Sequence, residues 1–241
     1  MPFELDAVNR ALRISGLELR YTGVTGSTNA DLLNDPSAGP GSVLIAGAQT
    51  AGRGRMERAF ASPEGGLYMS VLLRPISAAD ALLITPRAAV AVSRAVEDVA
   101  GRETGIKWVN DVLIGGKKVC GILAEARAGE HLDVVLGIGV NVFSVPEGLE
   151  DTAGAVFSAP AEQAREKLSA AILNELFATD CDVHAEYVRR CVVPGHEVTV
   201  HGAGGTYRAR ALAVDERFRL IVERSDGSRE ALDSGEVSVR L

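Results

Sequence analysis

The sequence predicts an α+β fold with a mostly antiparallel sheet, flanking helices and a small C-terminal β-barrel. Two apolar runs, 105–114 and 117–125, are joined by Gly115-Gly116, which is the pattern of a β-hairpin with a primed turn. Further strand-like runs lie at 43–46, 67–73 and 131–141. The middle of the chain is therefore expected to be mostly antiparallel sheet.

The segments around this sheet have helical spacing. Small apolar residues recur from Pro86 to Ala100, and Pro86 suits the first turn of that helix. A short helix is expected before a strand at 17–22, and helical spacing returns between 159 and 193.

Pro194-Gly195 ends the helical region, and short strands separated by turns follow. About five such strands are typical of a small β-barrel, with runs at 197–200, 207–214, 219–223 and 237–239. We therefore expect two domains, residues 1–193 and 194–241.

Composition limits the function classes. The 241 residues are 24% charged and 46% apolar, which is ordinary for a globular protein. The net charge of −7 argues against broad attraction to DNA or to an anionic membrane. The three cysteines have no Cys-x-x-Cys spacing, so we expect neither a disulfide framework nor a zinc site. We also expect a reducing, cytoplasmic location. Neither a signal peptide nor a membrane-spanning segment is predicted.

The loop from Gln49 to Arg55 places Arg53 and Arg55 between glycines. Glycine lets backbone N–H groups approach a ligand, and arginine presents a fork of donors to carboxylate or phosphate oxygens. The loop therefore predicts an anion clamp, although by its composition alone it equally fits an ordinary surface loop.

The run Ser27-Thr28-Asn29 stands at the start of an expected helix through Leu33. One hydroxyl suffices to cap that helix by accepting an exposed N–H group. The remaining polar side chains are then available to a ligand at the helix start.

The segment Lys107-Trp108-Val109-Asn110-Asp111 is predicted to end a buried strand. Buried charge is costly unless it is paired. Lys107 therefore either forms an ion pair with Asp111 or Glu125, or neutralises a bound anion. Gly137 and Gly139 weaken the strand that contains them unless a ligand or a helix must approach its backbone.

Taken together, these motifs, which span residues 27–141, resemble the biotin protein ligase family, and 194–241 resembles the family's C-terminal domain. The resemblance implies a class II synthetase-like fold with an SH3-like barrel. It also implies an enzyme that makes biotinyl-5′-AMP from biotin and ATP, then transfers biotin to a lysine of a biotin carboxyl carrier domain. The residues before Ser27 leave no room for a DNA-binding module, so a ligase-only form without a DNA partner is expected.

The resemblance also implies roles for individual residues. Biotin contacts are expected from Ser27, Thr28, Asn29, Gln49, Arg53, Gly54, Arg55, Lys107, Gly121 and Gly137. Nucleotide contacts are expected from Arg55, Arg58, Phe60, Asn110, Lys118 and Asn141. Lys107, Arg53 and Arg55 are the expected catalytic groups. Mg²⁺ is expected to bind with ATP; Asp111 is a candidate ligand, and its other ligands are left open.

The chain departs from the family pattern at Met56-Glu57, which brings closure of the loop into question, and at Val109, where many relatives have proline. Two alternatives stay open. A lipoate ligase or octanoyltransferase has a related fold, and Cys120 is the candidate nucleophile of the transferase. A non-catalytic biotin-binding module is the other alternative. Exposed sheet edges also leave a homodimer open.

Overall fold

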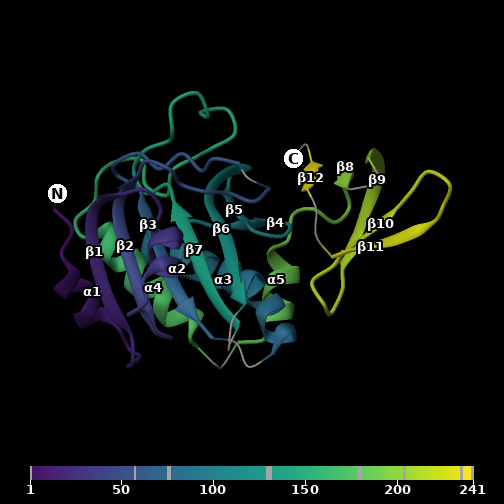
Figure 1. The fold of residues 1–241 in the computed structure, drawn as a ribbon. Helices are drawn as coiled ribbons and strands as arrows, with labels where there is room; N and C mark the ends of the chain where they lie inside the picture. Colours follow the sequence, from purple (N-terminus) through teal and green to yellow (C-terminus); the bar gives the residue numbers. More distant parts are fainter. Residues whose placement is uncertain are drawn as a thin grey trace.

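The computed structural model describes residues 2–56, 58–74, 77–128, 132–178, 181–202, 205–233 and 236–239. A seven-stranded sheet has the order β1-β2-β3-β7-β6-β5-β4, and a five-stranded sheet follows beside it (Figure 1). The strands of the large sheet are β1 (Glu18–Thr25), β2 (Ser42–Gln49), β3 (Leu67–Leu73), β4 (Gly105–Lys107), β5 (Asp111–Ile114), β6 (Lys117–Ala128) and β7 (Leu132–Val140).

The large sheet is mostly antiparallel, as predicted. Only the β1–β2 pair is parallel among the pairings of the described strands. Gly115 and Gly116 join β5 to β6 with φ angles of 57° and 77°. Positive φ at both central residues is what a type I′ turn requires, so the predicted hairpin turn is confirmed.

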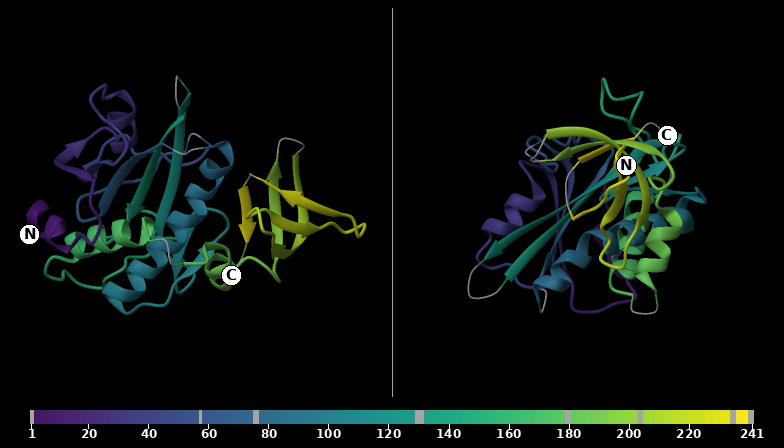
Figure 2. Two further views of the ribbon diagram at one scale, coloured as in Figure 1. Left: turned by 90° about the horizontal axis from the view of Figure 1, so that it is seen from below. Right: turned by 90° about the vertical axis from the view of Figure 1, so that its right-hand side faces the viewer.

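Helices cover both faces of this sheet. The long helix α3 (Ala78–Ala100) and α4 (Ala164–Leu176) lie on one face, and α2 (Thr28–Asn34) lies on the other (Figure 2). Two shorter helices are α1 (Leu5–Ala11) and α5 (Val183–Arg190). Fully buried alanines such as Ala88 and Ala95 let α3 pack closely on the sheet. The face with α2 is left for the candidate site.

The start of α3 differs from the prediction. The helix begins at Ala78 and not near Pro86, which lies in its interior. Ser77 caps it, because its hydroxyl oxygen accepts the N–H of Asp80. A capped start among good helix formers therefore outweighs the preference of proline for a first turn.

The predicted strand 105–114 is also wrong as a single element. The chain turns back at Trp108 to Asn110, so β4 and β5 are antiparallel and Lys107 faces Asp111 across the pair. Distant side chains hold this turn, as the Trp108 indole and the Val109 carbonyl both bond to residues from the C-terminal third of the chain. Such tertiary contacts leave no local signal in the sequence.

The second sheet has the order β11-β10-β9-β8-β12. It contains the five strands expected after Pro194-Gly195, namely β8 (Glu197–Gly202), β9 (Gly205–Val214), β10 (Leu220–Glu223), β11 (Arg229–Leu232) and β12 (Glu236–Val239). Its apolar interior includes Val200, Ala211 and Leu220. None of the helices in the described part of the chain is both long and apolar enough to cross a bilayer.

Candidate active site

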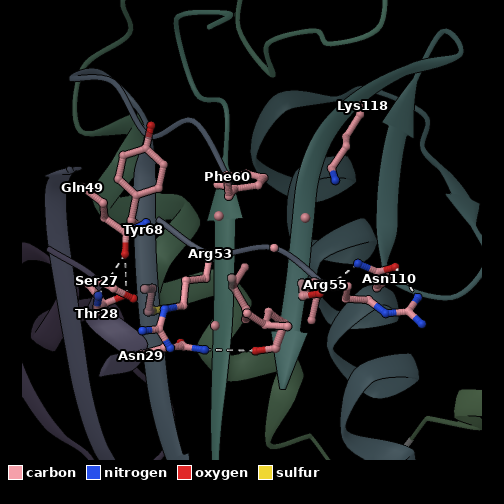
Figure 3. A pocket seen from close by; sticks show the side chains of 18 residues that line it. Ser27, Thr28, Asn29, Gln49, Arg53, Arg55, Phe60, Tyr68, Asn110 and Lys118 are labelled. Atoms are coloured by element: carbon pink, nitrogen blue, oxygen red, sulfur yellow. Dashed lines mark hydrogen bonds between the residues drawn. The ribbon is translucent and has the colours of Figure 1, made fainter. Parts of the chain in front are cut away.

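A pocket lies on the α2 face of the large sheet. It is enclosed by the start of α2, the loop between β2 and β3, and strands β6 and β7 (Figure 3). Its lining consists of Ser27, Thr28, Asn29, Gln49, Arg53, Gly54, Arg55, Phe60, Tyr68, Met69, Asn110, Lys118, Gly121, Ile122, Leu123, Gly137, Ile138 and Gly139.

Neutral polar groups gather at one end of this pocket. Ser27 caps α2, since its hydroxyl oxygen accepts the N–H of Ala30. Thr28 instead donates its backbone N–H to the side-chain oxygen of Gln49 at 2.9 Å. Capping therefore accounts for Ser27 alone, as the sequence suggested, and the side chains of Thr28, Asn29 and Gln49 line the pocket.

Asn29 is held in one orientation by its neighbours. Its Nδ2 group donates to the carboxylate of Glu125 at 2.7 Å, and its Oδ1 accepts the Ser70 hydroxyl at 2.6 Å. The amide also lies on the backbone of Gly137, where a Cβ atom would stand 3.0 Å from the Asn29 Cγ. Glycine at 137 is thus explained by a side chain from α2 that packs against the strand.

The loop from Thr50 to Ala61 folds back on itself over the pocket. Antiparallel bridges join Gln49 to Ser62 and Arg53 to Ala59. The Phe60 N–H donates to the Gly52 carbonyl at 2.9 Å. We call this segment the lid. Its tip lies at Met56, which has a φ of 54° and is 64% exposed, and the expected effect of Glu57 falls outside the described residues.

Two of the lid arginines, Arg53 and Arg55, reach across to strand β6 and to the turn between β4 and β5 (Figure 3). Arg53 Nη1 lies 3.4 Å from a Glu125 carboxylate oxygen, and Arg55 Nη1 donates to Asn110 Oδ1 at 3.1 Å. The lid therefore contacts the rest of the pocket through Arg53 on one side and Arg55 on the other.

A second pocket adjoins the first and carries more charge. The two share Gly54, Arg55, Phe60, Asn110 and Lys118. The second adds Met56, Arg58, Ala59, Lys107, Trp108, Asp111 and Val237. A neutral polar end thus runs into a region with four cationic side chains, which suits an elongated ligand with an uncharged head and an anionic tail.

Lys107 does not form the ion pair that a purely structural role requires. Asp111 pairs with Lys118 at 2.7 Å, and Glu125 pairs with Arg53. Within the described residues, no carboxylate pairs with Lys107. Its half-buried ammonium group at the second pocket is suited to a bound anion.

Comparison with known proteins now bears on this arrangement. The family model described as "Biotin/lipoate A/B protein ligase family" matches residues 21–141, and the model "Biotin protein ligase C terminal domain" matches 195–240. The chain belongs to the biotin/lipoate A/B protein ligase family.

Individual members of the family are similar over most of the chain. The bifunctional ligase/repressor of Bacillus subtilis is 34% identical over 236 residues, which cover 90% of this chain and 73% of the relative. The biotin–[acetyl-CoA-carboxylase] ligase of Mycobacterium tuberculosis is 36% identical over 86% of this chain and 83% of the relative. The Aquifex aeolicus biotin protein ligase, solved with biotin and ATP, superimposes with a TM-score of 0.76 at 27% identity. That alignment covers 92% of this chain and 98% of the Aquifex chain.

The structure brings together nearly all the residues predicted for this family member. Of the residues expected to contact biotin, all but Lys107 line the first pocket, and Lys107 lines the second. Of the residues expected to contact the nucleotide, all but Asn141 line the second pocket. The buried Asn141 amide donates to the carbonyl groups of Lys118 and Gly154, so it holds the backbone beneath Lys118.

Sequence reasoning missed several lining residues, namely Tyr68, Met69, Ile122, Leu123 and Ile138. They lie on strands that read as ordinary core segments. Tyr68 had one available signal, because it and Ser70 carry the hydroxyl groups of an otherwise apolar strand. The Tyr68 hydroxyl donates to the Pro63 carbonyl at the base of the lid.

Proposed function

We propose that this protein is an ATP-dependent biotin protein ligase. It forms biotinyl-5′-AMP from biotin and ATP, then transfers biotin to a lysine of a biotin carboxyl carrier domain. The observation that carries the proposal is the pair of adjoining pockets, the first with a neutral polar end and the second with four cationic side chains, which share Gly54, Arg55, Phe60, Asn110 and Lys118. Similarity to a named biotin–[acetyl-CoA-carboxylase] ligase over 86% of the chain, and to a biotin protein ligase solved with biotin and ATP over 92%, supports it.

In this proposal the first pocket holds the biotin head group. The ureido group of biotin has one carbonyl oxygen and two N–H groups, so it needs a few fixed neutral partners. The side chains of Thr28, Asn29 and Gln49 offer both donors and acceptors there. Because neighbouring groups already orient them, little conformational entropy is lost when biotin binds.

The second pocket then holds the reacting groups. The biotin carboxylate attacks the α-phosphate of ATP, and pyrophosphate leaves. Two anions must approach each other, so cations that are already in place lower the barrier, each by about 2.7–4 kcal/mol. Lys107 and Arg55, which line the second pocket, and Arg53, which lines the first, are assigned this role as charge stabilisers. Arg58, Phe60, Asn110 and Lys118 are assigned to the nucleotide.

The lid has a separate task in the proposal. An acyl-adenylate hydrolyses when water reaches it, so the second step requires a closed site. The contacts of Arg53 with Glu125 and of Arg55 with Asn110 close the lid against the sheet. The acceptor lysine must therefore enter at a margin of the lid.

Mg²⁺ accompanies ATP in the proposal. Mg²⁺ binds through one or two carboxylates together with substrate phosphates, and it requires no all-protein cage. This agrees with the described residues, which contain no group of three or more potential ligands. Asp111 supplies the carboxylate among the residues that line the second pocket. When bound, Mg²⁺ neutralises phosphate charge.

The thiol chemistry of a related transferase is disfavoured. Cys120 is 1% exposed and belongs to the apolar core, and neither pocket includes it. Burial raises the pKa of its thiol, so the nucleophilic thiolate is suppressed. Cys120→Ala is expected to keep biotin transfer, whereas an octanoyltransferase would lose transfer.

Several finer assignments belong to the same proposal. We infer a class II synthetase-like fold for residues 1–193 and an SH3-like barrel for 194–241, which the two separate sheets support. Three free cysteines support a cytoplasmic location, and the net charge of −7 supports a ligase that does not bind DNA. A homodimer through a sheet edge is also proposed.

Pyrophosphate release tests the proposed reaction. The protein is mixed with Mg-ATP and one of biotin, lipoate or octanoate, and pyrophosphate is measured. Release is expected with biotin and not with lipoate or octanoate. Release with lipoate but not biotin would assign the chain to the lipoate branch of the family, and biotin binding without any release would make it a non-catalytic module.

A further inference from the structure

The turn from Trp108 to Asn110 is held by two segments that are distant in the sequence. The indole Nε1 of Trp108 donates to the Phe218 carbonyl at 2.8 Å, across 110 residues. The Tyr187 hydroxyl in α5 donates to the Val109 carbonyl at 3.2 Å. A third bond to the turn comes from the lid, where Arg55 donates to Asn110.

The hydroxyl group of Tyr187 is unusual because it is fully buried. Burial raises its pKa well above the ordinary value, so the hydroxyl stays protonated and acts as a donor. Phenylalanine would supply the same ring to the core, whereas a buried hydroxyl is costly unless it is bonded. Its bond to the turn is therefore a specific feature of this position.

Residues of the second sheet hold the Tyr187 ring in place. Phe218, in the turn between β9 and β10, has a φ of 59° and packs edge-to-face on Tyr187, with ring centroids 5.3 Å apart. The His184 ring packs on Phe218 at the same distance, and His184 Nε2 lies 2.9 Å from the Asp215 carbonyl oxygen. Helix α5 and the second sheet thus form one support behind the turn.

The turn and the residues that flank it carry groups assigned to ATP or to its Mg²⁺. Lys107, Asn110 and Asp111 line the second pocket, and Val237 from the second sheet lines it as well. Asn110 is fixed to β6, because its Nδ2 donates to the Ile122 carbonyl at 3.0 Å and its own carbonyl accepts the Ile122 N–H. A shift of the turn therefore moves these groups together.

We propose that Tyr187 is a positioning residue for adenylation, which with Phe218 holds the Trp108–Asn110 turn so that Lys107, Asn110 and Asp111 face ATP. The expected change in pyrophosphate release rests on the proposed function. The expected change in the position of the turn does not. Of residues 107–111, only Asn110 lines the first pocket, whereas Lys107, Trp108, Asn110 and Asp111 line the second.

The experiment compares Tyr187→Phe with a matched control, Tyr207→Phe. Tyr207 also donates its hydroxyl, in this case to Glu230 within the second sheet, and it lies outside both pockets. Trp108 is the only tryptophan in the chain, so acrylamide quenching of its fluorescence reports on the turn without any activity. Steady-state pyrophosphate release in the presence of a biotin carboxyl carrier domain, and biotin binding without it, are measured on the same protein preparations.

For Tyr187→Phe we expect Trp108 to be quenched at least twice as strongly as in the wild type. The KM for ATP should rise, or kcat fall, by about 3- to 10-fold, which corresponds to one lost hydrogen bond. The biotin dissociation constant should change less than these kinetic constants, because Asn110 is the one turn residue that lines the first pocket. Tyr207→Phe should match the wild type in each assay. Phe218→Leu, which removes the ring that packs on Tyr187, should shift quenching and kinetics in the same direction.

A Tyr187→Phe protein that melts earlier but has wild-type quenching and kinetics would overturn the proposal, because its hydroxyl would then be merely structural. Equal changes in Tyr207→Phe would overturn it as well. If the wild type releases no pyrophosphate, the proposed function fails, and the contrast in Trp108 quenching still decides the positioning role.

Discussion

The ring of Phe60 lies directly on the backbone of Gly139, so that a Cβ atom at this glycine would stand 2.9 Å from Cζ of the ring. Gly139 faces Gly121 across the β6–β7 pair, and a Cβ at Gly121 would stand 2.8 Å from the same ring. Two glycines on neighbouring strands thus form a seat for the aromatic residue of the lid. The Lys118 ammonium lies 5.5 Å from the ring centroid and completes this contact.

Gly139→Ala is therefore expected to displace Phe60 and weaken the closed lid. Overpacking typically costs about 1–3 kcal/mol, so biotin should bind about tenfold more weakly and dissociate faster. Titration calorimetry measures the affinity. Gly23→Ala is the matched control, because a Cβ there meets nothing within 4 Å. Equal affinities for the two variants would contradict the seat.

Lys107→Ala should remove most adenylation while the protein stays folded. The ammonium group has no carboxylate partner among the described residues, so little stability is lost, but one preorganised cation of the second pocket is removed. Pyrophosphate release should fall by about 10²–10³-fold. Lys167→Ala on α4, whose Nζ bonds only the Glu162 carbonyl among the described residues, should leave release unchanged. Wild-type release by Lys107→Ala would refute the charge role.

Arg53→Ala should let biotinyl-5′-AMP escape. Its contact with Glu125 is one of the two that close the lid, and Arg53 is 59% exposed, so the protein itself should remain stable. Chromatography of the reaction mixture should find free adenylate, and mass spectrometry should find biotin on lysines outside the carrier site.

Glu125→Gln tests the same lid contact by changing the residue with which Arg53 pairs. The amide oxygen of glutamine still accepts the Asn29 Nδ2 group, while the negative charge opposite Arg53 is lost. Biotinyl-5′-AMP should escape from this variant as well, but less than from Arg53→Ala. If both variants retained the adenylate as the wild type does, the lid would not depend on this contact.

Acid should weaken the bond between α3 and α5. Burial by itself raises the pKa of Glu97, but hydrogen bonds from Arg190 and Thr104 outweigh it and hold that pKa below its ordinary value. A lowered pKa contributes stability that is present above the unfolded-state pKa and is lost as the pH falls through the folded-state pKa.

Glu97→Gln removes this titration. The variant should be less stable than the wild type at pH 7, and its urea midpoint should decline less between about pH 5 and pH 3. Glu223→Gln breaks an exposed ion pair with Arg229 and serves as the control, with a pH profile close to that of the wild type. Parallel profiles for Glu97→Gln and the wild type would contradict the assignment.

The parts of the fold that local patterns determine were predictable. Gly115-Gly116 specifies a two-residue turn, and Ser27 specifies the start of α2. The turn at Trp108 to Asn110 was not predictable, because the partners that hold it, Tyr187 and Phe218, lie 78 and 110 residues further along the chain. The start of α3 was misjudged because proline is a stronger signal in sequence than the Ser77 cap.

For the site, the charged and polar motifs were sufficient to find most lining residues. Lys107 stood out from the residues alone, because a buried charge is costly unless it is paired. Asn110 and the connection of both residues with the lid came from the resemblance to the biotin protein ligase family. The apolar lining of Met69, Ile122 and Ile138 could not be recognised, because its residues also satisfy the ordinary pattern of a strand in the core. The division between two pockets depends on tertiary arrangement and has no sequence signal.

The most direct test of the central claim is the mass of an isolated biotin carboxyl carrier domain after incubation with this protein, biotin and Mg-ATP. The account predicts a mass gain of one biotinyl group at a single lysine, which requires ATP and is abolished by Lys107→Ala. A carrier domain that stays unmodified, while the wild-type protein is folded and binds biotin, would contradict the account.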